Sequence, residues 1–361
     1  MLNSNRRNAA ALSSHSWRWR ILFSMGASAL ILFFLWWLVS SGNQAEDVSL
    51  FKNVLRDTVW WLASIYIVTT ILQTLLRAVR YQSLLKADGI MPIPGIPYMF
   101  LITLARNMFV DMVPARIGEI SYVLMLNRGY RIPVSACLST LFISIVLDIL
   151  ALAVILIAIV LGAMLSASQF EISVGSALVA TSLIVLISGL IIFSAVPLSR
   201  WFSRLMDFTR IKMLQRFGKF LLEVGMSIRR VQQREILSLT LSQSLGIRIL
   251  KYGGLYILFI AVTMASFNEF ASLPWWQILP AFISAEAAAS LPLPTFMSFG
   301  TYEGGGMLAF SVLGFAASDI LMVMFVIHLI SQVVDYTLGG LGLLGFFMVT
   351  GKNQREGERE R

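Results

Sequence analysis

The chain has 361 residues, of which 57% are hydrophobic and only 13% are charged, and its mean hydropathy is +0.79. This composition is typical of a polytopic membrane protein and leaves no stretch large enough for a separate soluble domain. The net charge of +9 suits anionic lipid head groups better than nucleic acid, and the single cysteine, Cys137, excludes disulfides and thiolate metal clusters.

Runs of about 20 apolar residues are long enough to cross a hydrocarbon core about 30 Å thick. The first run follows a basic cytoplasmic tail at 1–19 and is too long for a cleavable signal, so we interpret it as a signal-anchor helix, with an outer loop that ends at 57. In the run at 236–266, Gly253-Gly254 leaves open whether the segment is a single span or a broken one. Full spans are predicted near 20–40, 58–76, 134–165, 172–196, 236–266 and 319–350.

Two further apolar segments, 96–126 and 275–315, are interrupted by proline, glycine and charged residues. Neither segment contains two clean spans, because backbone polar groups at such interruptions cannot face lipid. We therefore predict two re-entrant or broken-helix hairpins. The expected fold is an all-α polytopic membrane protein with about six full spans plus these hairpins.

The two halves of the chain repeat one order of motifs. Each half has a basic motif, then a hairpin with a proline, glycine and glutamate in that order, and then a long span with one acid. The basic motifs are Arg77-Ala-Val-Arg80-Tyr81 and Arg248-Ile-Leu-Lys251-Tyr252, and the acids are Asp148 and Asp335. Duplication with ionisable residues at membrane depth is typical of transporters.

Lysine and arginine are distributed unevenly between the predicted loops. There are 23 of them in 1–20, 77–95, 114–133, 197–235 and 351–361, against 2 in 41–57, 166–171 and 267–274. The positive-inside rule then places both termini in the cytoplasm, with the two hairpins entering from opposite sides. The duplication becomes an inverted repeat, in which 58–196 and 236–350 are separated by a basic amphipathic segment at 197–235 and followed by a charged tail at 351–361.

Ionisable side chains inside the bilayer each cost about 2.5–3.5 kcal/mol on insertion scales, so we expect them to share one hydrated cavity. Asp148 and Asp335 have no basic neighbour within a helical turn, and we expect the two basic motifs to supply their partners. Glu286 also lies at membrane depth, whereas His328 is interpreted as a packing residue. The predicted substrate-binding residues are Arg77, Arg80, Arg106, Asp111, Arg116, Gly118, Glu119, Asp148, Arg248, Lys251, Gly300, Tyr302, Glu303 and Asp335.

The hairpin motifs indicate which ligand chemistry these residues suit. The arginines and the helix end after Pro114 suit an anionic group such as a lipid phosphate. Glu119 and Glu303 suit a cationic group or a coupling proton. We expect no cofactor, metal or catalytic site, since the sequence has no P-loop, nucleophile elbow or His-Cys-Asp cluster.

Three sequence motifs resemble the transmembrane domain of the lysylphosphatidylglycerol synthase/flippase family, and the resemblance extends over about residues 58–350. They are Pro114-Ala-Arg116-Ile-Gly118-Glu119, the Val-Leu-Asp148 span and the Gly300-x-x-Glu303 hairpin. The chain departs from the family pattern at Tyr122, where an arginine often stands. The resemblance implies transbilayer movement of a polar lipid in the bacterial cytoplasmic (inner) membrane, by a stand-alone relative without the aminoacyl-transferase domain.

The expected partners are membrane lipids with anionic or aminoacylated head groups, and a homo-oligomer or a partner lipid-modifying enzyme stays open. One alternative is a membrane transferase that acts on a phospholipid or a polyprenyl-phosphate sugar, with Glu46-Asp47 as a metal ligand or base. The other is a scaffold that binds lipid without moving it and recruits an enzyme through the basic segment 199–234.

Overall fold

The computed structural model describes residues 44–166, 196–206, 212–234, 236–312 and 314–359, together with a few isolated positions before 34 and between 186 and 194. The spans predicted near 20–40 and 172–196 lie almost entirely outside the described residues. In the described part the chain is helical and has no β-strand. This confirms the all-helical part of the predicted fold class.

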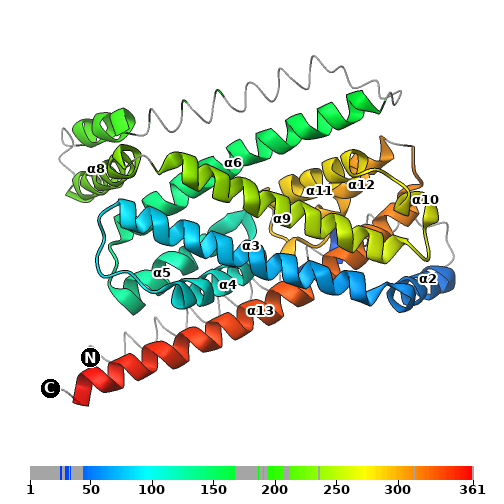
Figure 1. Cartoon of the computed structure of the whole chain (residues 1–361), viewed down its shortest axis with the longest axis horizontal. Helices are drawn as coiled ribbons and strands as arrows, with labels where there is room; N and C mark the ends of the chain where they lie inside the picture. Colours follow the sequence, from blue (N-terminus) through cyan, green and yellow to red (C-terminus); the bar gives the residue numbers. More distant parts are fainter. Residues whose placement is uncertain are drawn as a thin grey trace.

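Four of the helices that the structure describes are long and apolar enough to cross a membrane. They are α3 (Trp60–Ala87), α6 (Val134–Leu165), α9 (Leu237–Thr263) and α13 (Ala317–Arg359), the last of them apolar as far as Thr350. They run roughly side by side along the long axis of the molecule (Figure 1). Each corresponds to a predicted span.

Helix α3 is longer than the predicted span at 58–76, because it continues through Arg77 and Arg80 to Ala87. The sequence after residue 76 contains good helix formers and reaches its first glycine only at Gly89, so charge alone does not end the helix. Helix α9 is continuous across Gly253-Gly254, which settles this part of 236–266 as one helix.

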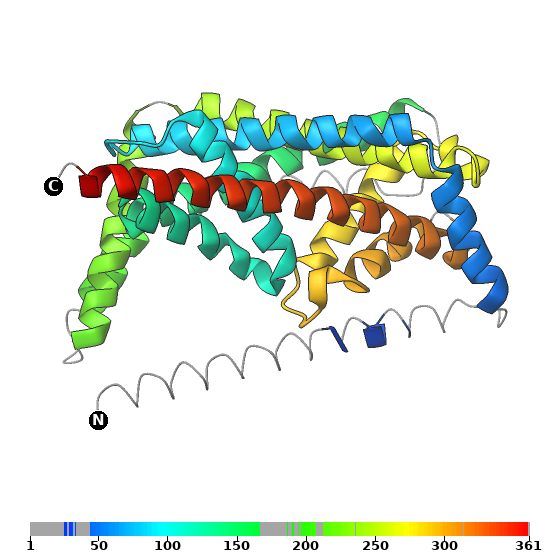
Figure 2. The same ribbon diagram turned by 90° about the horizontal axis from the view of Figure 1, so that it is seen from below.

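Two pairs of shorter helices occupy the predicted hairpin segments. The first pair is α4 (Ile96–Met112) and α5 (Ile120–Tyr130), joined by the 3-10 turn η1 (Pro114–Glu119); the second is α11 (Trp275–Ala289) and α12 (Thr301–Ser311), joined through η2 (Phe296–Ser298). The two turns contact each other. Figure 2 shows the pairs arriving from opposite ends of the molecule and meeting near its middle.

Each break in these pairs depends on a glycine. A Cβ atom at Gly118 would overlap the backbone carbonyl of Phe109, so η1 can fold back on α4 only without a side chain there. Gly300 has a φ of +89°, which is costly for other residues, and its N–H donates to the Glu303 carboxylate at 2.6 Å. Both predicted site glycines therefore shape the backbone.

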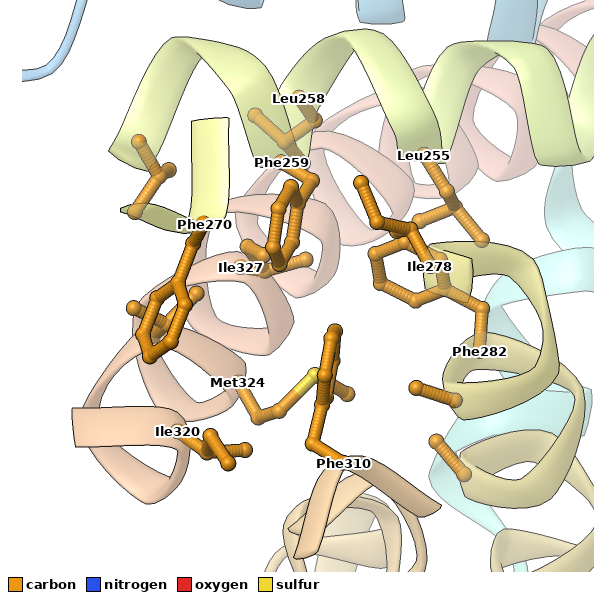
Figure 3. Packing of buried hydrophobic residues seen from close by; sticks show 14 of the residues in the cluster. Leu255, Leu258, Phe259, Phe270, Ile278, Phe282, Phe310, Ile320, Met324 and Ile327 are labelled. Carbon is orange, nitrogen blue, oxygen red and sulfur yellow. The ribbon is translucent and has the colours of Figure 1, made fainter. Parts of the chain in front are cut away.

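A cluster of aromatic and aliphatic side chains fixes the second pair to the long helices. Figure 3 shows Phe259 of α9, Phe282 of α11, Phe310 of α12 and Met324 of α13 around one core. The rings of Phe259 and Phe310 are stacked with centroids 5.7 Å apart. Tight packing of this kind makes α9, α11, α12 and α13 a rigid unit.

The first pair is held by different contacts. Tyr81 of α3 and Tyr122 of α5 lie in a second buried cluster, with ring centroids 4.7 Å apart. Helix α13 crosses α4 closely along Gly339, Gly342 and Gly345, where added Cβ atoms would meet side chains or backbone of α4. Small residues at such crossings are typical of helix packing in membranes.

Shorter helices lie at the two ends of the molecule (Figure 1). Helices α2 (Gln44–Asp57) and α10 (Asn268–Ala271) are at one end, and α8 (Lys212–Gln233) is at the other. Helix α8 comes from the predicted basic amphipathic segment, and its Ile228 and Val231 are buried among residues of α3 and α6. Arg230 of α8 also pairs with the buried Asp88 at 2.6 Å.

Replacing Gly118 by alanine tests the tight break after α4. The new Cβ overlaps the backbone at Phe109, so we expect a loss of stability of about 3 kcal/mol, the upper end for overpacking. The measurement is thermal unfolding of purified protein in detergent. Gly253→Ala is the control, because a Cβ there meets nothing within 4 Å and alanine is favoured in a helix. Equal unfolding temperatures for the two variants would contradict the break as described.

Candidate functional site

A cavity of about 180 Å³ lies between the long helices and the two helix pairs. Its lining is polar and charged, in contrast to the apolar sequence of the helices that surround it. The described ionisable residues that line it, apart from tyrosines, are Arg77, Arg106, Asp111, Glu119, Asp148, Arg248, Lys251, Glu286, His328 and Asp335.

Most of the predicted site residues surround this one cavity. Those in its lining are Arg77, Arg106, Asp111, Glu119, Asp148, Arg248, Lys251, Tyr302 and Asp335. Arg80 and Glu303 are fully buried behind the lining and bond to Asp148 and His328, which belong to it. Gly118 and Gly300 are outside the lining, and the side chain of Arg116 is outside the part that the structure describes.

The pair of Arg80 and Asp148 joins α3 to α6. Two hydrogen bonds connect the guanidinium to the carboxylate, Nη1 to Oδ1 at 2.5 Å and Nη2 to Oδ2 at 3.3 Å. Nη1 also donates to the Ser244 hydroxyl of α9 at 2.5 Å, and the Arg80 side chain is 0% exposed. Asp148 thus has the partner expected from the first basic motif.

The second basic motif finds a different acid from the one expected. Glu286 of α11 holds Lys251 at 2.7 Å and lies 3.6 Å from Arg248. Tyr252 donates its hydroxyl to the same carboxylate at 3.2 Å. The expectation that Asp335 holds these cations is wrong, because α11 inserts Glu286 next to α9, which spacing along one helix cannot reveal.

Arg106 and Glu119 form an ion pair across the break between α4 and η1. The guanidinium grips the carboxylate with Nε and Nη2, and the Nε–Oε2 distance is 2.9 Å. Asn107 connects this pair to α3, since its side-chain oxygen accepts from Arg106 at 3.0 Å and from Arg77 at 2.8 Å. The break is therefore fixed by charge as well as by backbone packing.

Three charges in the cavity are left without an ion pair among the described residues. Arg77 bonds to the neutral Asn107, and neither Asp111 nor Asp335 lies within 4.0 Å of a described cation. A charge in this position needs water or a ligand of opposite charge. The cavity therefore offers one guanidinium and two carboxyl groups to whatever enters it.

His328 differs most from its interpretation as a packing residue. It lines the cavity, and its Nδ1 lies 2.6 Å from Oε1 of Glu303. One signal in the sequence points to this role: His328, Gln332 and Asp335 have the spacing i, i+4, i+7 of one helix face. Asn107 and Glu286 were likewise absent from the predicted site.

The described acidic and imidazole side chains do not gather into a metal site. Within the helices whose side chains are placed, no group of three or more histidine, cysteine, aspartate or glutamate residues could hold a metal ion. The side chains of Glu46 and Asp47, the suggested acidic pair, are outside the described part.

The family model described as "Lysylphosphatidylglycerol synthase TM region" matches residues 14–339. The chain belongs to this family. Comparison with curated proteins and with solved structures gives no match. The match covers the whole cavity lining, three of the four long helices and the first half of α13, so the charged cavity lies in the region that matches the lysylphosphatidylglycerol synthase TM family.

Asp148→Asn tests the buried ion pair in this member of the family. The variant leaves the Arg80 guanidinium buried without a counter-charge, so we expect a loss of about 3–5 kcal/mol in the free energy of unfolding. Denaturant unfolding in detergent micelles measures it. Arg56→Gln is the control, since Arg56 pairs with Asp57 but is 75% exposed, so the loss of this pair should change stability little. Similar losses in the two variants would show that the Arg80 pair contributes little.

Proposed function

We propose that the protein moves a polar lipid across the membrane, with the head group in the central cavity and the acyl chains in the bilayer. The single observation that carries this proposal is the charged cavity enclosed by apolar helices. A structural core in lipid does not need so many charges, each of which is costly to bury. Membership of the lysylphosphatidylglycerol synthase TM family supports a lipid-related role.

The charges of the cavity suit a head group that contains phosphate. Arg77 faces the cavity without a counter-ion among the described residues, and a guanidinium can bind two phosphate oxygens at once. Asp111 and Asp335 would hold a cationic group, such as an amine. We therefore propose a phospholipid, an aminoacylated phospholipid or another lipid-linked head group as the substrate.

The arrangement of the helix pairs favours access from both sides. The pair α4–α5 extends toward the α8 end and the pair α11–α12 toward the α2 end, and their turns meet between (Figure 2). We propose that this is an inverted repeat with six full spans, both termini in the cytoplasm and the α8 end inside, in the bacterial inner membrane. Alternating exposure of the cavity would then move the head group from one leaflet to the other.

Lipids are the proposed partners, and the proposed activity is transport without a covalent step. One chain supplies the described lining of the cavity, so the proposed mechanism works in a monomer and equally in a homo-oligomer. The scaffold alternative differs in one respect: it predicts a bound lipid that stays in its leaflet. The transport experiment below distinguishes the two.

Glu119→Gln should abolish lipid movement while the protein stays folded. Glutamine keeps the shape of the side chain but removes the charge that holds Arg106 and the break after α4. The measurement is a head-group accessibility assay in liposomes, with labelled anionic, zwitterionic and aminoacylated phospholipids in parallel. We expect a rate at least about tenfold lower than that of the parent protein, as for a loss of about 1.4 kcal/mol or more.

The matched control is Glu269→Gln, which changes an exposed glutamate of α10 at the end of the molecule. It should leave the rate unchanged. Unaltered transport in Glu119→Gln would contradict the role given to the break. A folded parent protein that moves none of the lipids would favour the transferase or the scaffold.

A further inference from the structure

A group of three buried polar side chains lies at the edge of the cavity, beside the substrate charges described above. His328 and Gln332 come from α13 and Glu303 from α12, and they are 2%, 8% and 0% exposed. Both carboxylate oxygens of Glu303 are engaged: Oε2 accepts the Gly300 N–H at 2.6 Å, and Oε1 lies 2.6 Å from Nδ1 of His328. A buried carboxylate needs such partners.

The second ring nitrogen determines the protonation state of the histidine. Nε2 of His328 lies 3.0 Å from the amide nitrogen of Gln332. An amide nitrogen can only donate, so Nε2 accepts this hydrogen bond and the ring proton is on Nδ1, toward Glu303. The ring is neutral in this arrangement, and the amide oxygen of Gln332 is buried without a hydrogen-bond partner.

A half-turn of the Gln332 amide produces a second complete arrangement. The amide oxygen then faces Nε2 and accepts a hydrogen bond from it, and with Glu303 ionised this arrangement has a proton on both ring nitrogens. The imidazolium donates to Glu303 on one side and to Gln332 on the other. The site can thus hold the ring in either charge state without moving the backbone.

We propose that His328, Glu303 and Gln332 form a proton-binding site that opens to the lipid cavity. His328 and Gln332 both line the cavity, so once the Gln332 amide has turned and freed the Nε2 lone pair, a hydronium ion in the cavity water can transfer a proton to it and leave a water molecule behind. Binding of the proton converts a neutral ring beside a carboxylate into a buried ion pair. The proton site does not depend on the proposed function; only its coupling to lipid movement rests on that function.

Charges from the surrounding helices act on this proton. The rings of Tyr302 and Phe299 pack against the imidazole with centroids 4.4 and 4.6 Å away, and α2 approaches α13 through Phe51 against Phe325. Glu303 contacts the ring, and the other charged groups that line the same cavity are the acids Asp111, Glu119, Asp148, Glu286 and Asp335 and the cations Arg77, Arg106, Arg248 and Lys251.

The site also contacts the break in the second helix pair. Glu303 holds the N–H of Gly300, where α12 begins, and the backbone just before it is in the left-handed region at Met297 and Ser298, with φ of +56° and +58°. Such residues are strained and depend on their surroundings. A proton on His328 ties Glu303, and with it the start of α12, more strongly to α13.

The histidine content of the chain makes a direct test possible. The sequence has two histidines, so His15→Gln leaves His328 as the only one. The protein, labelled with nitrogen-15 in histidine and placed in lipid nanodiscs, is followed by solid-state NMR from about pH 8 to about pH 5. We expect a neutral ring with its proton on Nδ1 at the higher pH, and an imidazolium at the lower pH. If the ring of His328 keeps the same protonation state across this pH range, the proposal is overturned.

Gln332→Leu tests the role of the amide. The imidazolium of this variant lacks its acceptor, so at the pH where half of the parent rings are protonated we expect at least about threefold less imidazolium relative to neutral ring. Thr337→Val, an exposed position on the same helix, is the control and should titrate as the parent does. An unchanged titration in Gln332→Leu would overturn the role of the amide.

Coupling to lipid movement is measured separately in the liposome assay. We expect the rate to differ at least about threefold between about pH 6 and about pH 8 in the parent protein, and this difference to vanish in His328→Gln. If the difference persists in this variant, coupling is overturned even where the NMR titration is seen. If no lipid moves at any pH while His328 titrates, the proposed function fails and the proton site stands.

Discussion

A charge inside the hydrocarbon layer must meet an opposite charge or water, and the structure of this protein depends on that constraint. The buried pair Arg80–Asp148 joins α3 to α6, which are far apart in sequence, and the pair Arg106–Glu119 fixes α4 to the turn after it. Removing one member leaves the other without compensation, so the pairs specify how the helices assemble. The same constraint keeps the cavity polar.

Much of the fold could be predicted because its signals are local. Long apolar runs predicted the four long helices, and proline and glycine within apolar segments predicted the two breaks. The end of α3 could not be placed, because Arg77 and Arg80 resemble a cytoplasmic boundary until their buried partners are known. A charged residue marks the end of a membrane span only where water solvates the charge.

For the candidate site, too, the residues could be predicted from local signals but their partners could not. The energetic cost of placing a charge in lipid was enough to predict which ionisable residues lie around the cavity, because few positions in an apolar helix tolerate a charge. Their pairing depends on which helix faces which, and there Glu286 took the place expected for Asp335. The neutral residues of the site, Asn107 and Gln332, carry no such cost and were missed, although one links two arginines and the other contacts His328.

The bond from Arg80 to Ser244 has a mechanical consequence. It connects α3 directly to α9, the central helices of the two halves, and Gly254 of α9 lets Tyr66 and Thr69 of α3 pack closely against it. Separating α3 from α9 along this line would break the Arg80–Ser244 bond, so the two helices form one fixed side of the cavity. Any change of shape at the cavity then falls to α4 and α5, because α11 and α12 share one packed core with α9 and α13.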